Sequence, residues 1–222
     1  MYIADQILDF YRNLKPPDYL PDGVEVMNPY NHKNSWEYVK TFYQKFYPDN
    51  RPRTLLIGIN PGRFGGGITG IPFTDPIRLK ENCGIDNDLV KKPELSSQFI
   101  YEVISAAGSP EAFYAKYYIT AVSPLGFMKD GKNLNYYDLP DLQANWEPFM
   151  VHALQKQVQI CGNREVAFSV GMGKNIRYLE YLNGKYTIFD TLKSLPHPRW
   201  VMQYRLKRKE EFIRMYRNLL GV

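Results

Sequence analysis

The sequence predicts an α/β protein of three layers, in which helices cover both faces of a central, mainly parallel four-stranded sheet. Short apolar runs containing β-branched residues and bounded by turn residues indicate strands at 53–59, 117–122, 165–170 and 186–189. Segments with helical spacing of apolar residues separate these runs. Strands that alternate with helices favour parallel pairing, with the connecting helices lying on both faces of the sheet.

The helices are expected where apolar residues recur every three or four positions between breaking residues. Ser35 can cap the second helix, and Ser96 or Ser97 can cap the third. The expected helices cover residues 2–15, 35–46, 96–107, 141–160, 174–182 and 201–220. Polar connections are expected at 16–33, 75–93 and 123–135.

Length and composition are those of one globular domain. The chain has 222 residues, of which 44% are hydrophobic and 23% charged. Within one domain over 1–222, we expect an N-terminal helical region at 1–50, a core at 51–200 that carries the site, and a basic C-terminal helix at 201–222. The net charge of +5 is compatible with a polyanionic partner.

Cysteine content and hydropathy exclude several classes. Cys83 and Cys161 are the two cysteines, which is too few for a four-thiolate zinc or iron–sulfur site. We therefore expect no metal and no other cofactor. The low cysteine content also indicates the reducing cytoplasm, with association with the nucleoid if the source is bacterial. We expect the protein to be a monomer. No apolar stretch approaches the roughly 20 residues of a membrane span, and the N-terminus resembles an amphipathic helix rather than a signal peptide.

The segment from Leu55 to Phe73 carries the strongest motif. An apolar run ends in Gly58-Ile59-Asn60-Pro61-Gly62, and a glycine-rich loop follows. A strand that ends in a rigid turn with an amide at its tip is typical of a ligand site, and the loop has so few side chains that its backbone can approach a ligand closely. The spacing fits neither a dinucleotide fingerprint nor a phosphate-binding loop with Gly-Lys-Ser/Thr.

Four residues directly follow the predicted strands: Asn60, Ser123, Gly171 and His197. Because ligands bind beyond the carboxyl ends of parallel strands, we expect these residues to share one edge of the sheet. His197 lies between two prolines, which fix the direction of its ring, although a lone histidine is more often structural than catalytic. No pair of carboxylates and no Gly-x-Ser-x-Gly pattern indicates another hydrolytic mechanism.

The motifs resemble those of the uracil-DNA glycosylase superfamily. The Gly-Ile-Asn-Pro-Gly turn at 58–62 and its continuation at 64–73 are most similar to the single-strand-selective monofunctional branch, of which this chain resembles a divergent, bacterial-type member. Later motifs occur in the order of that family, at residues 123–125, 131–134, 138–139, 170–173 and 197–198.

The resemblance implies a DNA-repair enzyme that hydrolyses the N-glycosidic bond of uracil or another deaminated base. Asn60 would position the attacking water, and Phe73 would stack on the extruded base. His197 would donate a hydrogen bond to the base carbonyl, a contribution of roughly 3–4 kcal/mol. The implied substrate contacts are Gly58, Ile59, Pro61, Gly62, Phe64, Gly67, Ala121 and Ser123. DNA contacts are expected at Arg63 and Arg199, and also at Arg205 and Lys207, although a basic helix face is often only solvated.

Two departures from the family pattern affect specificity. Ala121 occupies the position where the family has a base-recognising asparagine. Ser123, Asn133 or a backbone group then takes over, or the base preference shifts towards xanthine or hypoxanthine, or the activity on uracil is weaker. The segment after His197 continues Arg199-Trp200-Val201 and is shorter than in the family, which favours single-stranded DNA as the partner.

Two other functions stay open at this point. The protein could be a non-catalytic binder of single-stranded nucleic acid or damaged bases, since the base-recognising asparagine is missing. It could also hydrolyse free nucleosides, which would need no basic surface. Steep salt dependence of the activity would favour DNA over a free nucleoside.

Overall fold

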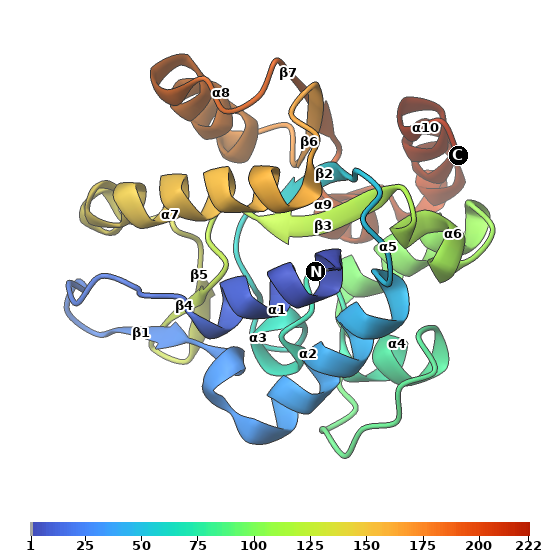
Figure 1. The fold of residues 1–222 in the computed structure, drawn as a ribbon, viewed down its shortest axis with the longest axis horizontal. Coiled ribbons are helices and arrows are strands. Elements are labelled where there is room, and N and C mark those ends of the chain that lie inside the picture. The colour runs from blue at the N-terminus through green and yellow to red at the C-terminus, as the bar shows by residue number, and fades with distance from the viewer. Residues whose placement is uncertain (1) are drawn as a thin grey trace.

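Four parallel strands form the central sheet of the structure, a computed structural model that describes residues 2–222 (Figure 1). The strands pair in the order β3-β2-β6-β7, so their carboxyl ends lie at one edge. They are β2 (Thr54–Gly58), β3 (Tyr117–Ala121), β6 (Val166–Val170) and β7 (Thr191–Leu195). The predicted fold class is confirmed.

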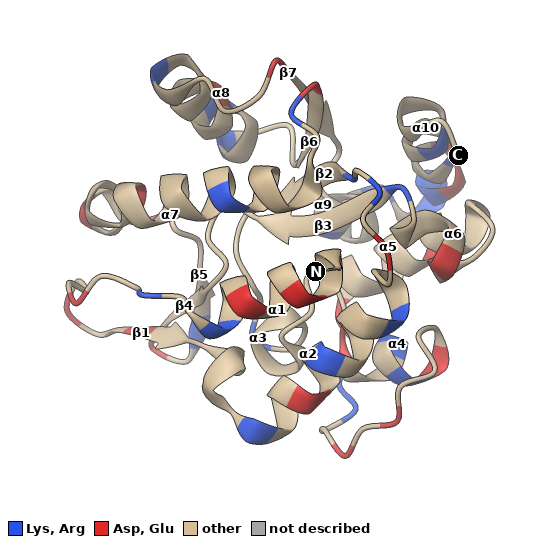
Figure 2. Cartoon of the chain, in the orientation of Figure 1, with Lys and Arg blue, Asp and Glu red and all other residues tan. Residues whose placement is uncertain are grey.

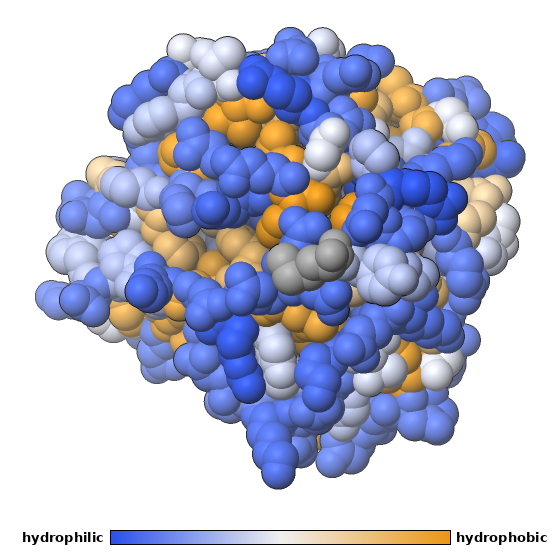
Figure 3. Space-filling view, viewed as in Figure 1, coloured by the Kyte–Doolittle hydropathy of each residue, from blue (hydrophilic) through white to orange (hydrophobic). Residues whose placement is uncertain are grey.

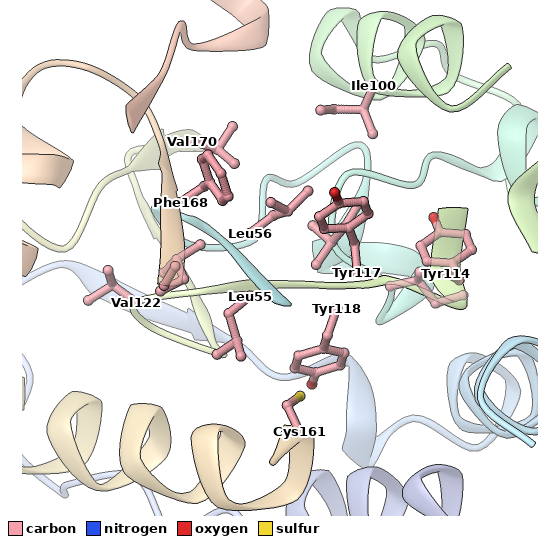
Figure 4. Close-up of a cluster of buried hydrophobic side chains, with 14 of the residues drawn as sticks. Leu55, Leu56, Ile100, Tyr114, Tyr117, Tyr118, Val122, Cys161, Phe168 and Val170 are labelled. Atoms are coloured by element: carbon pink, nitrogen blue, oxygen red, sulfur yellow. The ribbon is translucent and has the colours of Figure 1, made fainter. Parts of the chain in front are cut away.

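Helices α5 (Leu95–Ala106) and α7 (Pro140–Cys161) cover opposite faces of this sheet. Figure 4 shows Ile100 of α5 on one side of the strands and Cys161 of α7 on the other. Both side chains are buried against the apolar strand residues. Removal of this apolar surface from water is the main force that holds the three layers together.

The remaining helices surround these layers. Helix α1 packs on α7, and the last two helices pack on α5. They are α1 (Ile3–Arg12), α2 (Lys33–Phe46), α3 (Gly66–Thr69), α4 (Pro76–Glu81), α6 (Pro110–Tyr114), α8 (Lys174–Tyr186), α9 (Pro198–Tyr204) and α10 (Lys209–Leu220), with short 3₁₀ turns η1 (Pro29–Asn31) and η2 (Leu206–Arg208).

A second, antiparallel sheet replaces two of the predicted polar connections. It consists of β1 (Val24–Met27), β4 (Gly126–Lys129) and β5 (Lys132–Leu134) in the order β1-β4-β5. These strands are short and only partly apolar, so hydropathy did not reveal them. Asp130-Gly131 joins β4 to β5 with positive φ at both residues, and an Asp-Gly pair is a hairpin signal that could have predicted them.

The predicted strand at 186–189 is wrong, because helix α8 continues to Tyr186 and ends at Thr187 with φ of 50°. The apolar run that follows packs as a loop, in which the amide of Asn183 bonds to both backbone groups of Phe189. The fourth strand is instead β7. It lies at the edge of the sheet and is largely exposed at its start, which explains its weak apolar signal.

Several helix ends also differ from the prediction. Helix α2 begins after His32 rather than at Ser35, and Glu94 precedes α5, so that Ser96 and Ser97 lie inside that helix. Both serines are buried, and the Ser97 hydroxyl accepts the Asp75 backbone N–H at 2.9 Å. The local sequence pattern predicts Ser97 as a helix cap, but in the structure its side chain takes part in a tertiary hydrogen bond instead.

The C-terminal basic segment is broken rather than continuous. Helix α9 ends at Tyr204, and α10 begins at Lys209 after the η2 turn. Figure 2 shows positively and negatively charged residues interspersed along the chain, and Figure 3 shows that the same face is mainly hydrophilic with scattered apolar patches. No helix within residues 2–222 is long and apolar enough to cross a membrane.

Candidate active site

A cavity of about 340 Å³ opens at the carboxyl edge of the central sheet. Asn60 lies two residues after β2 ends, and His197 lies two residues after β7 ends, so the parallel topology brings both to this cavity. The sequence prediction that these two residues share one edge is confirmed by their position.

The Asn60 amide is fixed by backbone groups that follow β5. Its Nδ2 donates to the Leu134 carbonyl at 3.1 Å, and its Oδ1 accepts the Tyr136 N–H at 3.0 Å. These two bonds together define which end of the amide is oxygen. Oδ1 keeps a second lone pair, which can accept a hydrogen bond from a water molecule in the cavity.

A buried asparagine links this arrangement to the sheet. The Tyr136 hydroxyl donates to Asn175 Oδ1 at 3.0 Å, and Asn175 Nδ2 donates to the Ile57 carbonyl and the Ser169 hydroxyl, both at 3.1 Å. The end of β2 and the segment that orients Asn60 are thereby held together. No sequence pattern pointed to Asn175, although it lies directly after the predicted glycine turn at 171–173.

His197 is held as a neutral hydrogen-bond donor. Its Nδ1 accepts the Arg199 backbone N–H at 3.2 Å at the start of α9, so the proton of the neutral ring lies on Nε2. Burial, together with a smaller effect of the positive charge of Arg199, lowers the pKa of His197 to about 4. Nε2 has no hydrogen-bond partner among the described residues, which leaves this N–H for a ligand.

Phe73 and Gly58 form a close contact in the cavity wall. Phe73 has φ of 51°, which is a strained value for a bulky residue, and both residues line the cavity. A Cβ atom at Gly58 would lie 2.8 Å from Cε2 of the Phe73 ring. The glycine is therefore required for the ring to occupy this position.

We expect Gly58→Ala to displace the Phe73 ring and to reduce the activity of this site about 10²-fold, because a shift of about 1 Å in a positioned group has this effect. Steady-state kinetics measure the loss of activity, and thermal unfolding measures the effect of the displaced ring on stability. Gly184→Ala is the matched control, since its Cβ would enter open space on α8. Equal activity of the two variants would contradict the packing role of Gly58.

Most of the predicted site residues lie together. The following line the cavity: Gly58, Ile59, Asn60, Pro61, Gly62, Phe73, Ala121, His197 and Arg199. They come from the ends of the neighbouring strands β2 and β3, from the segment after β2, and from the segment after β7, which is separated from β2 by β6. The common carboxyl edge of the parallel sheet therefore brings them together.

The structure does not bring Ser123 or Gly67 to the cavity. Ser123 is buried, and its hydroxyl donates to the Leu125 carbonyl at 2.7 Å, so it cannot supply the polar group that Ala121 lacks. Gly67 donates its N–H to the Gly62 carbonyl at 2.9 Å, and a Cβ there would lie 2.8 Å from that oxygen. The predicted contact of Gly67 with the base is replaced by a role in loop packing.

The other predicted contacts lie outside the cavity. Phe64 stacks between two cations, with the Arg63 guanidinium carbon 4.4 Å and the Lys92 ammonium 3.8 Å from its ring centre. The Arg63 side chain also donates to the Gly131 carbonyl. Arg205 and Lys207 are exposed beyond the end of α9, where they remain accessible to phosphates.

Several cavity residues were not predicted. Three of them, Trp200, Gln203 and Tyr204, lie on α9, which directly follows His197, so their proximity could have been inferred from that position. The full set of unpredicted lining residues is Gly66, Pro72, Glu94, Ser96, Thr120, Asn135, Tyr137, Trp200, Gln203 and Tyr204. Asn133, which the sequence suggested as a possible base-recognising residue, also lines the cavity.

Within residues 2–222, no group of three or more histidine, cysteine, aspartate or glutamate side chains is arranged to hold a metal ion. Cys83 and Cys161 are buried, and burial raises the pKa of Cys83 to about 12. The polar groups of the cavity are instead amides, hydroxyls, one imidazole, one guanidinium and one carboxylate, a set able to form hydrogen bonds with a polar heterocycle.

Comparison with known families decides the relationship. The model of the Uracil DNA glycosylase superfamily matches residues 44–220, which include Asn60, Phe73 and His197. The chain belongs to this superfamily. The resemblance inferred from the motifs is thus confirmed. All residues that line the cavity lie within the part of this chain that the superfamily model matches.

Individual superfamily members support the same assignment. The single-strand selective monofunctional uracil-DNA glycosylases of Rattus norvegicus and Mus musculus are each 28% identical over 173 residues, which cover 69% of this chain and 60% of each relative. A crystal structure of wild-type SMUG2 from Pedobacter heparinus is 39% identical, with a TM-score of 0.96 over 100% of this chain and 97% of that one.

Proposed function

We propose that the protein is a monofunctional DNA glycosylase that hydrolyses the N-glycosidic bond of uracil or another deaminated base, with a preference for single-stranded DNA. The observation that carries this proposal is the placement of the Asn60 amide and the neutral His197 ring on one cavity that Phe73 also lines. The rat and mouse relatives, which are named single-strand selective monofunctional uracil-DNA glycosylases, support the same activity.

The chemistry follows from the two side chains. Asn60 Oδ1 holds a water molecule for attack on the anomeric carbon of the sugar, and orientation rather than strong basicity is its contribution. The departing base gains negative charge on its carbonyl oxygen. His197 Nε2–H donates a hydrogen bond to that oxygen, and a donor that is already neutral and oriented requires no rearrangement during the reaction.

Hydrolysis without strand cleavage fits the cavity composition. A lyase reaction needs a lysine amine that forms a Schiff base with the sugar. Among the described residues, no lysine lines the cavity itself, although Lys174 lines the pocket beside it, which also contains His197. The rat and mouse relatives, which are named monofunctional glycosylases, support a monofunctional activity.

The surface beside the cavity favours single strands. Trp200 and Tyr204 lie one turn apart on α9, are 39% and 66% exposed, and line the cavity mouth. The Arg205 guanidinium carbon lies 4.8 Å from the centre of the Trp200 ring. Exposed aromatic rings next to cationic side chains bind unpaired bases by stacking and their phosphates by charge.

Trp200→Ala is expected to weaken binding of a single-stranded oligonucleotide about 5- to 100-fold, because one stacked base contributes energy of this order. Fluorescence anisotropy measures the affinity. Tyr181→Ala removes another exposed aromatic ring, on α8, and is the matched control. If the two variants bind single strands equally well, Trp200 is not a stacking residue.

Base release from matched single- and double-stranded oligonucleotides tests the function. Uracil, hypoxanthine and xanthine are compared at one position of the same sequence, and we expect release of at least one base, faster from the single strand. Binding without release of any base would favour a non-catalytic binding protein. Cleavage of free nucleosides with no dependence on salt would favour a nucleoside hydrolase.

A further inference from the structure

The cavity contains one carboxylate, that of Glu94, in an unusual orientation. Glu94 is the residue that precedes α5, yet its side chain does not accept a hydrogen bond from the helix N–H groups. Its backbone N–H donates to Asp75 Oδ2 at 2.9 Å, while its carboxylate is turned to the cavity wall and is only 10% exposed. An acidic side chain near a helix N-terminus is normally stabilised there by the helix dipole.

The glycine-rich loop leaves room for this carboxylate. A Cβ atom at Gly62 would lie 2.9 Å from Glu94 Oε1, and one at Gly65 would collide with Oε2. Larger residues at these two positions would therefore push the carboxylate away. The loop backbone and the Glu94 side chain fit one another, so that the carboxylate forms part of the wall.

No donor among the described residues forms a hydrogen bond with the Glu94 carboxylate. The nearest cationic group is Arg199 Nη2 at 3.6 Å, beyond ordinary hydrogen-bond distance. Burial raises the pKa of Glu94, and the positive charge of Arg199 opposes this shift. None of the described buried side-chain oxygens lacks a hydrogen-bond partner, so the Glu94 carboxylate oxygens face the open cavity. A ligand that donates a hydrogen bond there can pair with the carboxylate.

Two other polar groups of the wall are already engaged. The Thr120 hydroxyl donates to Gln157, and Asn133 Oδ1 accepts the Arg63 backbone N–H at 3.0 Å. Ala121 offers only a methyl group. The Glu94 carboxylate, which can only accept, and the oriented His197 Nε2–H donor are unengaged groups of opposite kind in this wall, beside polar side chains such as Asn135, Tyr137 and Gln203.

We propose, on the basis of the proposed glycosylase function, that Glu94 determines specificity by accepting a hydrogen bond from a ring N–H of the extruded base. Deamination turns an amino group beside a bare ring nitrogen into a carbonyl beside a ring N–H, as in cytosine to uracil and adenine to hypoxanthine. His197 then donates to the carbonyl and Glu94 accepts the N–H. A bare ring nitrogen would face the carboxylate with a lone pair, which disfavours the undamaged base.

A comparison of two substrates tests this role. Single-stranded oligonucleotides carry uracil or N3-methyluracil, which lacks the ring N–H, and single-turnover rates are measured for wild type, Glu94→Gln and the exposed control Glu165→Gln. We expect Glu94→Gln to slow uracil release about 10- to 100-fold, as for loss of a charge-assisted hydrogen bond, and to change N3-methyluracil release less than about threefold. Glu165→Gln should match wild type on both.

Equal loss on both substrates would overturn the proposal, because it would assign Glu94 to packing or to the ion pair with Arg199. If wild type releases neither base, the proposed glycosylase function fails, and the comparison is made on affinity instead. Asn60→Ala protein with and without Glu94→Gln is then titrated with both oligonucleotides. Selective weakening for uracil supports recognition by Glu94, and equal weakening overturns it.

Discussion

His197→Ala is expected to slow uracil release from a single-stranded oligonucleotide by about 10²–10³-fold, the usual effect of removing one oriented donor to a developing negative charge. The N–H that remains unengaged in the structure, at Nε2, is the group lost. Single-turnover kinetics measure the chemical step directly. His152→Ala on the exposed side of α7 is the control and should match wild type.

The same residue gives the reaction a distinctive pH dependence. Because the folded pKa of His197 is about 4, against an ordinary value of 6.5, the ring stays neutral and its donor state does not change between pH 8 and about pH 5. The rate should therefore show no acid limb from His197 in this range. A tenfold fall in rate per pH unit below pH 6.5 that vanishes in His197→Ala would contradict the neutral-donor role.

Stability responds to the same shift with a defined sign. Between pH 6.5 and about pH 4 the unfolded chain binds a proton at His197 that the folded protein does not. The free energy of unfolding therefore falls as pH drops through this window. Urea unfolding at several pH values should show a smaller fall in His197→Ala than in wild type.

Asn60→Ala is expected to reduce the single-turnover rate by about 10²–10³-fold, because the water is no longer held for attack. Asn60→Asp should not restore the rate, although it keeps the shape of the side chain. In wild type Nδ2 donates to the Leu134 carbonyl, and an aspartate oxygen at that position would face the carbonyl with a lone pair. The carboxylate would turn away or be protonated.

A matched control for Asn60 is Asn145→Ala, since Asn145 is exposed on α7 and donates only to the Asp141 carbonyl. It should retain wild-type activity. Thermal unfolding of all variants separates misfolding from loss of function. Full activity of Asn60→Asp would show that the donor bond to Leu134 is not needed to orient this side chain.

The centre of the site could be predicted from sequence because it depends on short-range patterns. An apolar strand ending in Gly58-Ile59-Asn60-Pro61-Gly62 specifies both the strand and the turn that follows. The proline pair around His197 likewise fixes the start of α9. Parallel topology then brings the two segments to one edge without further information.

The residues that complete the site depend on tertiary packing and left no such pattern. Asn175 and Glu94 act through groups that are distant in sequence: Asn175 bonds to the end of β2, and Glu94 packs against Gly62 and Gly65. The small antiparallel sheet was missed because its strands are only three or four residues long, too short for a clear alternation to stand out. Yet β5 ends at Leu134, whose carbonyl helps to orient Asn60.

The central claim is that this cavity excises a deaminated base, with Asn60 acting on the water and His197 on the leaving group. The most direct measurement is the single-turnover rate of uracil release from a single-stranded oligonucleotide by wild type and by the Asn60→Ala/His197→Ala double variant. We predict enzyme-dependent release by wild type and a loss of at least about 10³-fold in a double variant that still folds. Release at an unchanged rate by the folded double variant would contradict the account, because the chemistry would then lie elsewhere.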